Sequence, residues 1–274
     1  MKQRLITLLL VLVLLAGAGL LAYPSVSDYW NSMHASQAVS AYNEEVQRMD
    51  PTRYDELWAA ARNFNRVLRE QHGGTSLTDE QRAKYDSFLD IDGTGIMGYI
   101  EIPNIKVSLP IYHGTADSVL QIAVGHLEWS SLPTGGAGTH CVLSGHRGLP
   151  SAKLFTNLDK LVVGDTFVLR ALDEVLTYEV DQILIVEPQD VSALQIEAGK
   201  DLCTLVTCTP YGINTHRLLV RGHRVENRSE SIRVTSDATQ VEPLLVAPVV
   251  ALPMLLMLLV LLLLPGGKRK KKHG

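Results

Sequence analysis

Two long apolar segments bracket the chain, and the polar residues beside them are basic. The first runs from Leu5 to Ala22 and the second from Leu244 to Leu264, and each is long enough to cross a bilayer as a helix. Two basic residues precede the first segment, and residues 268–272, all basic, follow the second. Because basic flanks favour the cytoplasmic side, the pattern predicts cytoplasmic termini and an extracellular domain over residues 24–242. Small residues at 16–18 leave open a cleaved signal peptide instead of an N-terminal anchor.

Between these segments the pattern first favours helices, over residues 26–90. Asp50-Pro51 is typical of an N-cap followed by a proline in the first helical position. Thr78-Asp79-Glu80-Gln81 has the spacing of a capping box and predicts a third helix that reaches Phe88. We expect these helices to pack against the rest of the outer domain. Apolar residues that share one face of the middle helix are Tyr54, Leu57, Trp58, Ala61, Phe64, Val67 and Leu68.

From Gly98 to Val225 the pattern changes to short β-rich runs separated by Pro, Gly, Asn and Asp, as is typical of strands joined by turns. Many closely spaced short strands favour a closed β-barrel, because closure leaves no exposed sheet edge. One short helix is expected over Val119–Val124. The predicted strands are Met97–Ile102, Val107–Tyr112, His140–Ser144, Thr166–Arg170, Leu176–Glu187, Cys203–Cys208 and Arg217–Val225.

The formal net charge of −4 conceals an uneven distribution of charge. All 29 acidic residues lie between the two apolar segments, whereas seven of the 25 basic residues lie in the terminal tails. The part between the segments therefore has 18 basic and 29 acidic residues, a net charge of −11. Such a domain repels phosphates, which argues against a nucleic acid partner. The basic tails suit the anionic headgroups of a lipid bilayer.

The cysteines point to thiol chemistry. There are three, Cys141, Cys203 and Cys208, and outside the membrane an odd number leaves at least one free thiol. Cys208 ends a strand-like apolar run and precedes a Pro/Gly turn, a placement that suits a nucleophile. The alternative for Cys208 is a buried structural cysteine. No spacing of Cys and His residues predicts a zinc site, and no metal or cofactor is expected.

Two further residues suit an acyl-transfer site built around Cys208. His146, within Gly145-His146-Arg147-Gly148, could protonate a leaving amine as a general acid; the alternative is a turn histidine bonded to the backbone. Arg217 begins the run after the Cys208 turn, and its permanently charged guanidinium could stabilise an oxyanion. Arg147 is expected to be structural. On the same strand as Arg217 lie two rival cations and two expected surface histidines: Arg221, Arg224, His216 and His223.

Several of these motifs together resemble the signatures of sortases, and more narrowly those of the class C, pilus-building type. The resemblance extends from about Gly98 to Val225. It implies an eight-stranded barrel and the roles of nucleophile for Cys208, general acid for His146 and oxyanion stabiliser for Arg217. The motifs that carry it are Gly98–Pro103, Leu109–Gly114, Ser144–Pro150, Ser151–Phe155, Thr207–Gly212 and Thr215–Arg217.

The resemblance also implies a reaction and partners. A membrane-anchored cysteine transpeptidase would cleave a pilin or surface protein within a sorting motif of the Leu-Pro-x-Thr-Gly kind. A lysine of the next pilin would then resolve the thioacyl enzyme and form an isopeptide bond. The alternative is a housekeeping sortase that attaches surface proteins to a peptidoglycan precursor. A different class of interpretation is a membrane scaffold or receptor with an inactive site, against which the intact Cys208, His146 and Arg217 argue.

One feature departs from the class C pattern. Such sortases usually carry a lid with an Asp-Pro-aromatic motif before the barrel, and the corresponding residues here are Thr75-Ser76-Leu77. The charged and the aromatic anchor are both missing. A lid in Gly73–Leu77, if present, is therefore expected to be held weakly or to dock only through Leu77.

The other two cysteines have equal offsets from the catalytic candidates. Cys141 lies five residues before His146, and Cys203 lies five before Cys208. If their strands are parallel neighbours, as in the sortase barrel, the two thiols lie at one level and share a face. The alternatives are two small buried core residues, a disulfide, or a pair sensitive to oxidants.

These patterns divide the chain into six parts. They are an N-terminal signal or membrane anchor (1–23), a helical region with a possible lid (24–96), the catalytic barrel (97–226), a linker (227–243), a C-terminal transmembrane helix (244–264) and a basic cytoplasmic tail (265–274).

Overall fold

The computed structural model describes residues 2–71 and 77–227. The chain divides into two compact units, with the boundary after Ser27. The predicted second apolar segment and the basic tail lie outside the described residues, as do residues 72–76 of the predicted lid.

Helix α1 (Lys2–Arg48) extends the predicted N-terminal span as one continuous helix that includes Pro24. Within the described ranges it is the one helix with a stretch long and apolar enough to cross a membrane, judged by length and composition, and the mean hydropathy of that stretch is 2.8. A signal sequence meets the same criteria, so both interpretations of Leu5–Ala22 stand. Beyond Ser27, Asn31 Nδ2 donates to the carbonyl of Ser151 at 2.8 Å.

Side-chain caps fix the starts of the next two helices where the sequence predicts them. At α2 (Pro51–Glu70), the Asp50 carboxylate accepts the backbone N–H of Thr52 at 2.8 Å. At α3 (Asp79–Tyr85), Thr78 and Gln81 form both hydrogen bonds of a capping box. Helix α3 ends before Phe88, because the last N–H groups of this segment bond to carbonyls three residues back in a tightened turn.

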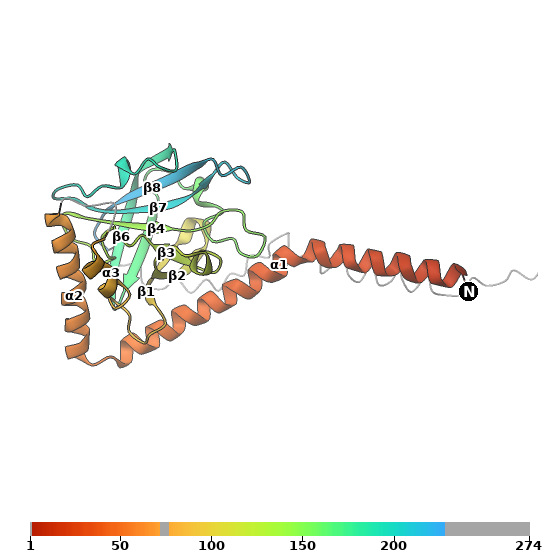
Figure 1. Cartoon of the computed structure of the whole chain (residues 1–274), viewed down its shortest axis with the longest axis horizontal. Helices are drawn as coiled ribbons and strands as arrows, with labels where there is room; N and C mark the ends of the chain where they lie inside the picture. Colours follow the sequence, from red (N-terminus) through yellow and green to blue (C-terminus); the bar gives the residue numbers. More distant parts are fainter. Residues whose placement is uncertain (1, 72–76, 228–274) are drawn as a thin grey trace, which may run out of the picture. The chain divides into compact units, whose positions relative to one another are not determined.

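Within the described residues, eight strands form a closed barrel in the order β1-β2-β3-β4-β7-β8-β6-β5, so the predicted barrel is confirmed. Figure 1 shows the barrel with most of its strands labelled. Strands β4 and β7 are parallel neighbours, and β8 pairs antiparallel with β7. In the part of the chain that the structure describes, the connections between strands contain four single-turn helices: η1 (Pro103–Ile105), α4 (Asp117–Leu120), η2 (Leu158–Lys160) and η3 (Ser192–Leu194). The strands are β1 (Ile96–Ile102), β2 (Val107–His113), β3 (Val124–His126), β4 (Thr139–Ser144), β5 (Thr166–Ala171), β6 (Glu174–Val186), β7 (Asp201–Thr209) and β8 (His216–Arg224).

The segment around β3 differs from the sequence prediction. The helix expected over Val119–Val124 is instead α4, which ends at Leu120. Val124 begins β3 and pairs in parallel with Ile111 of β2. A strand of three residues is too short for its apolar alternation to be recognised, so the sequence pattern predicts no strand here.

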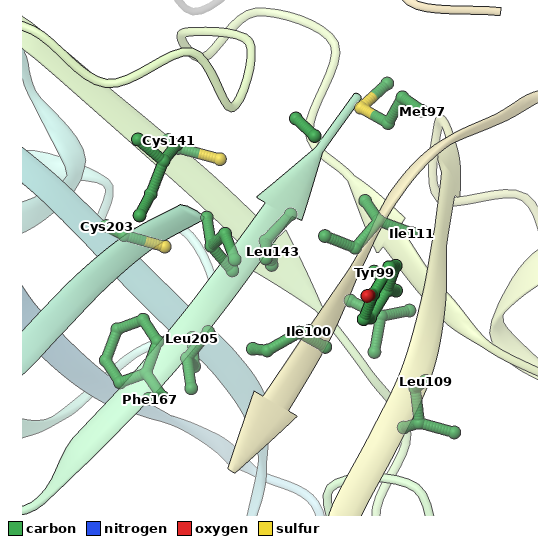
Figure 2. Packing of buried hydrophobic residues seen from close by; sticks show 14 of the residues in the cluster. Met97, Tyr99, Ile100, Leu109, Ile111, Cys141, Leu143, Phe167, Cys203 and Leu205 are labelled. Atoms are coloured by element: carbon green, nitrogen blue, oxygen red, sulfur yellow. The ribbon is translucent and has the colours of Figure 1, made fainter. Parts of the chain in front are cut away.

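The barrel interior is filled by apolar side chains, and two cysteines lie among them. Cys141 of β4 and Cys203 of β7 are register partners in the parallel pair, and both are buried. Figure 2 shows their sulfur atoms directed into the same packed interior as Leu143 and Leu205. All three cysteines are free, so the structure favours the prediction of two small core residues over a disulfide.

Helix α2 packs on the barrel near the start of β4, as Figure 1 shows. Trp58, Ala61, Phe64 and Leu68 form its buried face. Asn65, also buried, exchanges hydrogen bonds with the backbone of Leu132, at 3.0 and 2.7 Å. These contacts pay the desolvation cost of a buried amide and fix the helix to the segment that leads into β4.

Candidate active site

Strand β7 places Cys208 at the end of the barrel. Cys208 is the penultimate residue of the strand and is partly exposed, whereas its neighbours Thr207 and Thr209 are buried. The alternation of strand side chains turns Cys208 away from the face that carries Cys203. A turn follows in which Gly212 has a φ of 75°, a left-handed conformation that glycine adopts without strain.

His146 follows β4, the parallel neighbour of β7. Ser144 is the register partner of Val206, so two further residues along each strand lead to His146 and Cys208. Gly145 ties the two strands beyond the register: its N–H donates to the carbonyl of Val206 at 3.0 Å, and its carbonyl accepts the Thr207 hydroxyl at 2.7 Å. The structure therefore brings the His146 turn and the Cys208 turn to the same end of the barrel.

The glycine before His146 is required by packing. A Cβ atom at Gly145 would lie 2.7 Å from the ring of Phe155, which is fully buried. The N–H of Phe155 in turn donates to the carbonyl of His146 at 3.1 Å. Gly145 and His146 therefore pack against the loop that contains Phe155, and His146 remains partly exposed.

Arg217 lies opposite Cys208 as its register partner in the antiparallel pair of β7 and β8. One nitrogen of its guanidinium donates to the carbonyls of His216 and Asn214, at 3.2 and 3.4 Å. Within the described part of the chain it forms no ion pair with a carboxylate. Its positive charge therefore remains available to a group that becomes negative at Cys208.

The two rival arginines of β8 are committed elsewhere. Arg221 binds both carboxylate oxygens of Asp181, at 2.9 and 3.0 Å, and one of Glu197 at 3.0 Å. Hydrogen bonding to Asp181 raises the pKa of Arg221 above its ordinary value. Arg224 donates to backbone carbonyls, including those of Val175 and Thr177. The two histidines of β8 are exposed, as their positions in the sequence predict. Arg217 is thus the strand's one cation beside Cys208 without a carboxylate partner among the described residues.

Comparison with known proteins decides the family. A model of the sortase domain matches residues 100–225. Sortase D of Bacillus subtilis (strain 168) is 31% identical over 159 residues, and the match covers 57% of this chain and 77% of that protein. The chain belongs to the sortase family. It is accordingly an enzyme, because sortases are cysteine transpeptidases.

Solved structures narrow the resemblance within the sortases. Sortase C1 of Streptococcus agalactiae is 53% identical, with a TM-score of 0.68, and the match covers 70% of this chain and all of that one. Sortase C of Clostridium perfringens, solved with the C-terminal cell wall sorting motif, is 43% identical, with a TM-score of 0.63 and coverages of 70% and 100%. Both are sortases of class C, as the sequence motifs predict.

Arg147 connects the His146 turn to the Cys208 turn, a contact that the sequence pattern does not predict. Its side chain is nearly buried and forms an ion pair with Asp159 of η2. It also donates to the hydroxyl of Thr209 at 3.3 Å, and its guanidinium carbon lies 5.8 Å from the centre of the Tyr211 ring. Its position beside His146 was visible in the sequence, but Asp159, twelve residues away, carried no local signal.

The described flanks of the predicted lid lie beside α2 and α3 in this sortase. Leu77 is buried, with 7% of its surface exposed, and Gln81 Nε2 donates to Oε1 of Gln71 at 3.1 Å. Near the end of α2, Arg69 donates to the carbonyl of Ala137 at 2.8 Å, just before β4 begins. His146 follows the opposite end of that strand, so the Gln71 flank lies away from the Cys208 turn.

Proposed function

We propose that this sortase cleaves a sorting motif of the Leu-Pro-x-Thr-Gly kind and joins the acyl fragment to a lysine of a pilin subunit. The observation that carries the proposal is the pairing of Cys208 with Arg217, an arginine without a carboxylate partner in the described structure. Strand β7, which carries Cys208, is also hydrogen-bonded to the His146 turn through Thr207 and Gly145. Transfer to an amine rather than to water is what defines a transpeptidase.

Each of the three residues has a role in the first half-reaction. The thiolate of Cys208 attacks the carbonyl carbon of the motif's threonine, and the developing oxyanion receives hydrogen bonds from Arg217. His146 donates a proton to the glycine nitrogen as the peptide bond breaks. The products are a thioacyl enzyme and a released peptide with a free amine.

The second half-reaction returns the enzyme to its starting state. The neutral amine of an acceptor lysine attacks the thioester carbonyl, and His146, now without its proton, accepts one from the attacking nitrogen. Arg217 again stabilises the oxyanion. Collapse of the intermediate breaks the bond to sulfur, which releases the Cys208 thiolate and leaves an isopeptide bond between two subunits.

The resemblance to class C sortases favours pilin assembly over cell wall attachment. The sortase C of C. perfringens was solved with a cell wall sorting motif, which supports a substrate of that kind here. The apolar segment at 244–264 supports the same assignment, because a second anchor is part of the class C pattern. A housekeeping sortase would instead transfer the acyl group to an amine of a peptidoglycan precursor.

The membrane topology and the division into six parts belong to the same proposal. Both termini lie in the cytoplasm, and the barrel, over residues 97–226, works outside the cell, where pilins are assembled. The supporting observations are the apolar stretch of α1 and the basic residues that flank the two apolar segments.

The test is a transfer assay with the full chain in neutral detergent. A sorting-motif peptide is mixed with two acceptors, a lysine-containing pilin peptide and a peptidoglycan-precursor amine, and the products are identified by mass spectrometry. We expect a thioacyl adduct on Cys208 and an isopeptide product with lysine. Cys208→Ala should give neither, whereas Cys203→Ala, a matched change in the core, should give both. Transfer only to the precursor amine would establish the housekeeping alternative, and no adduct at all would indicate an inactive scaffold.

A further inference from the structure

A hollow of about 500 Å³ lies between α2 and the barrel, away from Cys208. Thr139 and Asp201, the first residues of the parallel strands β4 and β7, line it, whereas the catalytic candidates lie at the other ends of these strands. Cys208 lies seven positions after Asp201, which at about 3.3 Å per residue is roughly 23 Å. A ligand in the hollow would therefore not compete with a substrate at Cys208.

Four arginines line this hollow. Arg62, Arg66 and Arg69 are spaced by four and three residues along α2 and so share one face of the helix. Arg224, the last residue of β8, contributes the fourth guanidinium from the barrel. Such a gathering of positive charge is unexpected in a part of the chain with a net charge of −11.

Most of this positive charge is not neutralised by carboxylates. Arg62 lies over the ring of Trp58, at 5.2 Å from its centre, and forms no hydrogen bond or ion pair with the residues that the structure describes. Arg69 donates to a backbone carbonyl, and Arg224 donates to backbone carbonyls and to the Asn227 amide oxygen. Carbonyl partners hold a guanidinium in place and leave its charge intact. Arg66 alone is paired, with Glu70 at 2.7 Å.

Two carboxylates also line the hollow, Glu174 and Asp201. Both carboxylate oxygens of Asp201 accept hydrogen bonds from neighbouring residues. One oxygen accepts the N–H of Gly136 at 2.7 Å, and the other accepts the hydroxyls of Tyr178 at 3.0 Å and Thr139 at 3.4 Å. Glu174 is exposed. The lining therefore combines four arginines with two carboxylates, and one of these, Asp201, already accepts hydrogen bonds from uncharged groups.

We propose that this arginine-lined hollow binds the phosphoryl group of a phosphate ester. The arginines that line the hollow come from two elements, α2 and β8. A planar carboxylate is satisfied by a single arginine fork, whereas a tetrahedral phosphoryl group offers oxygens to several donors at once. The ligand is either a soluble phosphate ester or the headgroup of an anionic phospholipid, and both present the same chemistry to the arginines.

The test measures phosphate binding by the full chain in neutral detergent, with phosphorus NMR line widths as the readout. The probes are inorganic phosphate, glycerol phosphate and a short-chain phosphatidylglycerol, titrated at constant ionic strength. We expect saturable binding of the phosphoryl compounds, with an affinity that falls about tenfold or more in the double variant Arg62→Gln, Arg69→Gln. Arg82→Gln, an exposed arginine of α3 outside the hollow, should bind as the unmodified chain does.

The outcomes distinguish a soluble phosphate ester from a lipid headgroup, and they test phosphoryl binding separately from transpeptidase activity. Equal binding of glycerol phosphate and the phospholipid would support a soluble ester, and tighter binding of the phospholipid would support a lipid headgroup. Binding that does not saturate, that survives the double variant, or that acetate displaces equally well would overturn the proposal. Cleavage of a sorting-motif peptide should be unchanged in the double variant, which verifies its fold. If that variant does not fold, Arg62→Gln serves alone, because Arg62 makes no hydrogen bond within the described residues.

Discussion

Cys208 and Arg217 lie directly opposite each other across β7 and β8. Residues paired in this way have side chains on one face of the sheet, with Cα atoms about 4.5 to 5.5 Å apart. The preceding pair on that face, Val206 and Leu219, is buried in a small apolar cluster with Val142 and Leu194. Cys208 and Arg217 therefore share the rim of a packed patch on the outer face of the barrel.

This pairing predicts that Arg217→Lys loses most transpeptidase activity although the charge is kept. An ammonium cannot reproduce the planar fork of donors that a guanidinium offers to an oxyanion. We expect kcat/KM for a sorting-motif peptide to fall by about a hundredfold or more, with an unchanged melting temperature. Arg82→Lys, on α3, is the matched control. Near-normal turnover in Arg217→Lys would remove the role assigned to Arg217.

Arg147 should matter for catalysis through the two turns that it joins. In Arg147→Met, the contacts with Asp159, Thr209 and Tyr211 are lost, so the His146 turn is held to the Cys208 turn by fewer contacts and its position relative to Cys208 is less exact. We expect peptide cleavage to slow by about tenfold or more, while iodoacetamide alkylates Cys208 as before, because alkylation needs no general acid. Equal losses in both reactions would show instead that the change disturbs Cys208 itself.

The features predicted correctly from the sequence are those encoded locally or by alternation. The caps at Asp50 and Thr78 depend on residues two or three positions away. The shared level of the two core cysteines follows from their equal offsets, given the parallel strands that the resemblance to sortases implies. Strand bounds agree with the structure to within two residues for the seven predicted strands, because their apolar alternation is long enough to recognise.

The features that were missed depend on tertiary contacts. Val124 was assigned to a helix because only its pairing with Ile111, thirteen residues earlier, makes it a strand residue. The ion pair between Arg147 and Asp159 forms when a loop closes around Phe155, and nothing in the spacing of the two residues indicates it. The arginine-lined hollow likewise needs α2 to be placed against the barrel. Such contacts join residues that have no periodic relationship in the sequence.

Removing the predicted lid segment should leave Cys208 as accessible as before. Its Gln71 flank follows Arg69, which donates to Ala137 just before β4, and Gln81, beyond Leu77, donates to Gln71. The described flanks are thus joined to each other at the end of α2, and no hydrogen bond or ion pair between described residues joins them to the His146 turn. Deletion of residues 73–76 is therefore expected to leave the alkylation rate of Cys208 unchanged, with the melting temperature as a check of folding. A many-fold rise in that rate would show that the segment is a functioning lid.

Cys203 and Cys208 should respond in opposite ways to substitution by alanine. Burial raises the pKa of the Cys203 thiol well above its ordinary value, so the thiol is both inaccessible and protonated. Cys203→Ala should cost about 1 kcal/mol of unfolding free energy or more and retain activity, whereas Cys208→Ala should retain stability and lose activity. Under non-reducing conditions, iodoacetamide should label one cysteine in the native chain and three after unfolding. A single label after unfolding would establish a disulfide between Cys141 and Cys203.

Stability should decrease as pH falls below about 6.5, partly because of His140. This histidine of β4 is buried between the Gln195 carbonyl, at 2.8 Å from Nδ1, and the Thr204 hydroxyl, at 2.7 Å from Nε2. Burial lowers its pKa below the ordinary value of 6.5, and the nearby Arg221 acts in the same direction. Below pH 6.5 the unfolded chain binds a proton that the folded chain excludes, so the stabilisation from the neutral form is complete above that pH and is lost below it. Urea unfolding at pH 7.5 and 5.5 should therefore show a smaller pH difference in His140→Gln than in the unmodified chain, and an equal difference would exclude His140 as a cause.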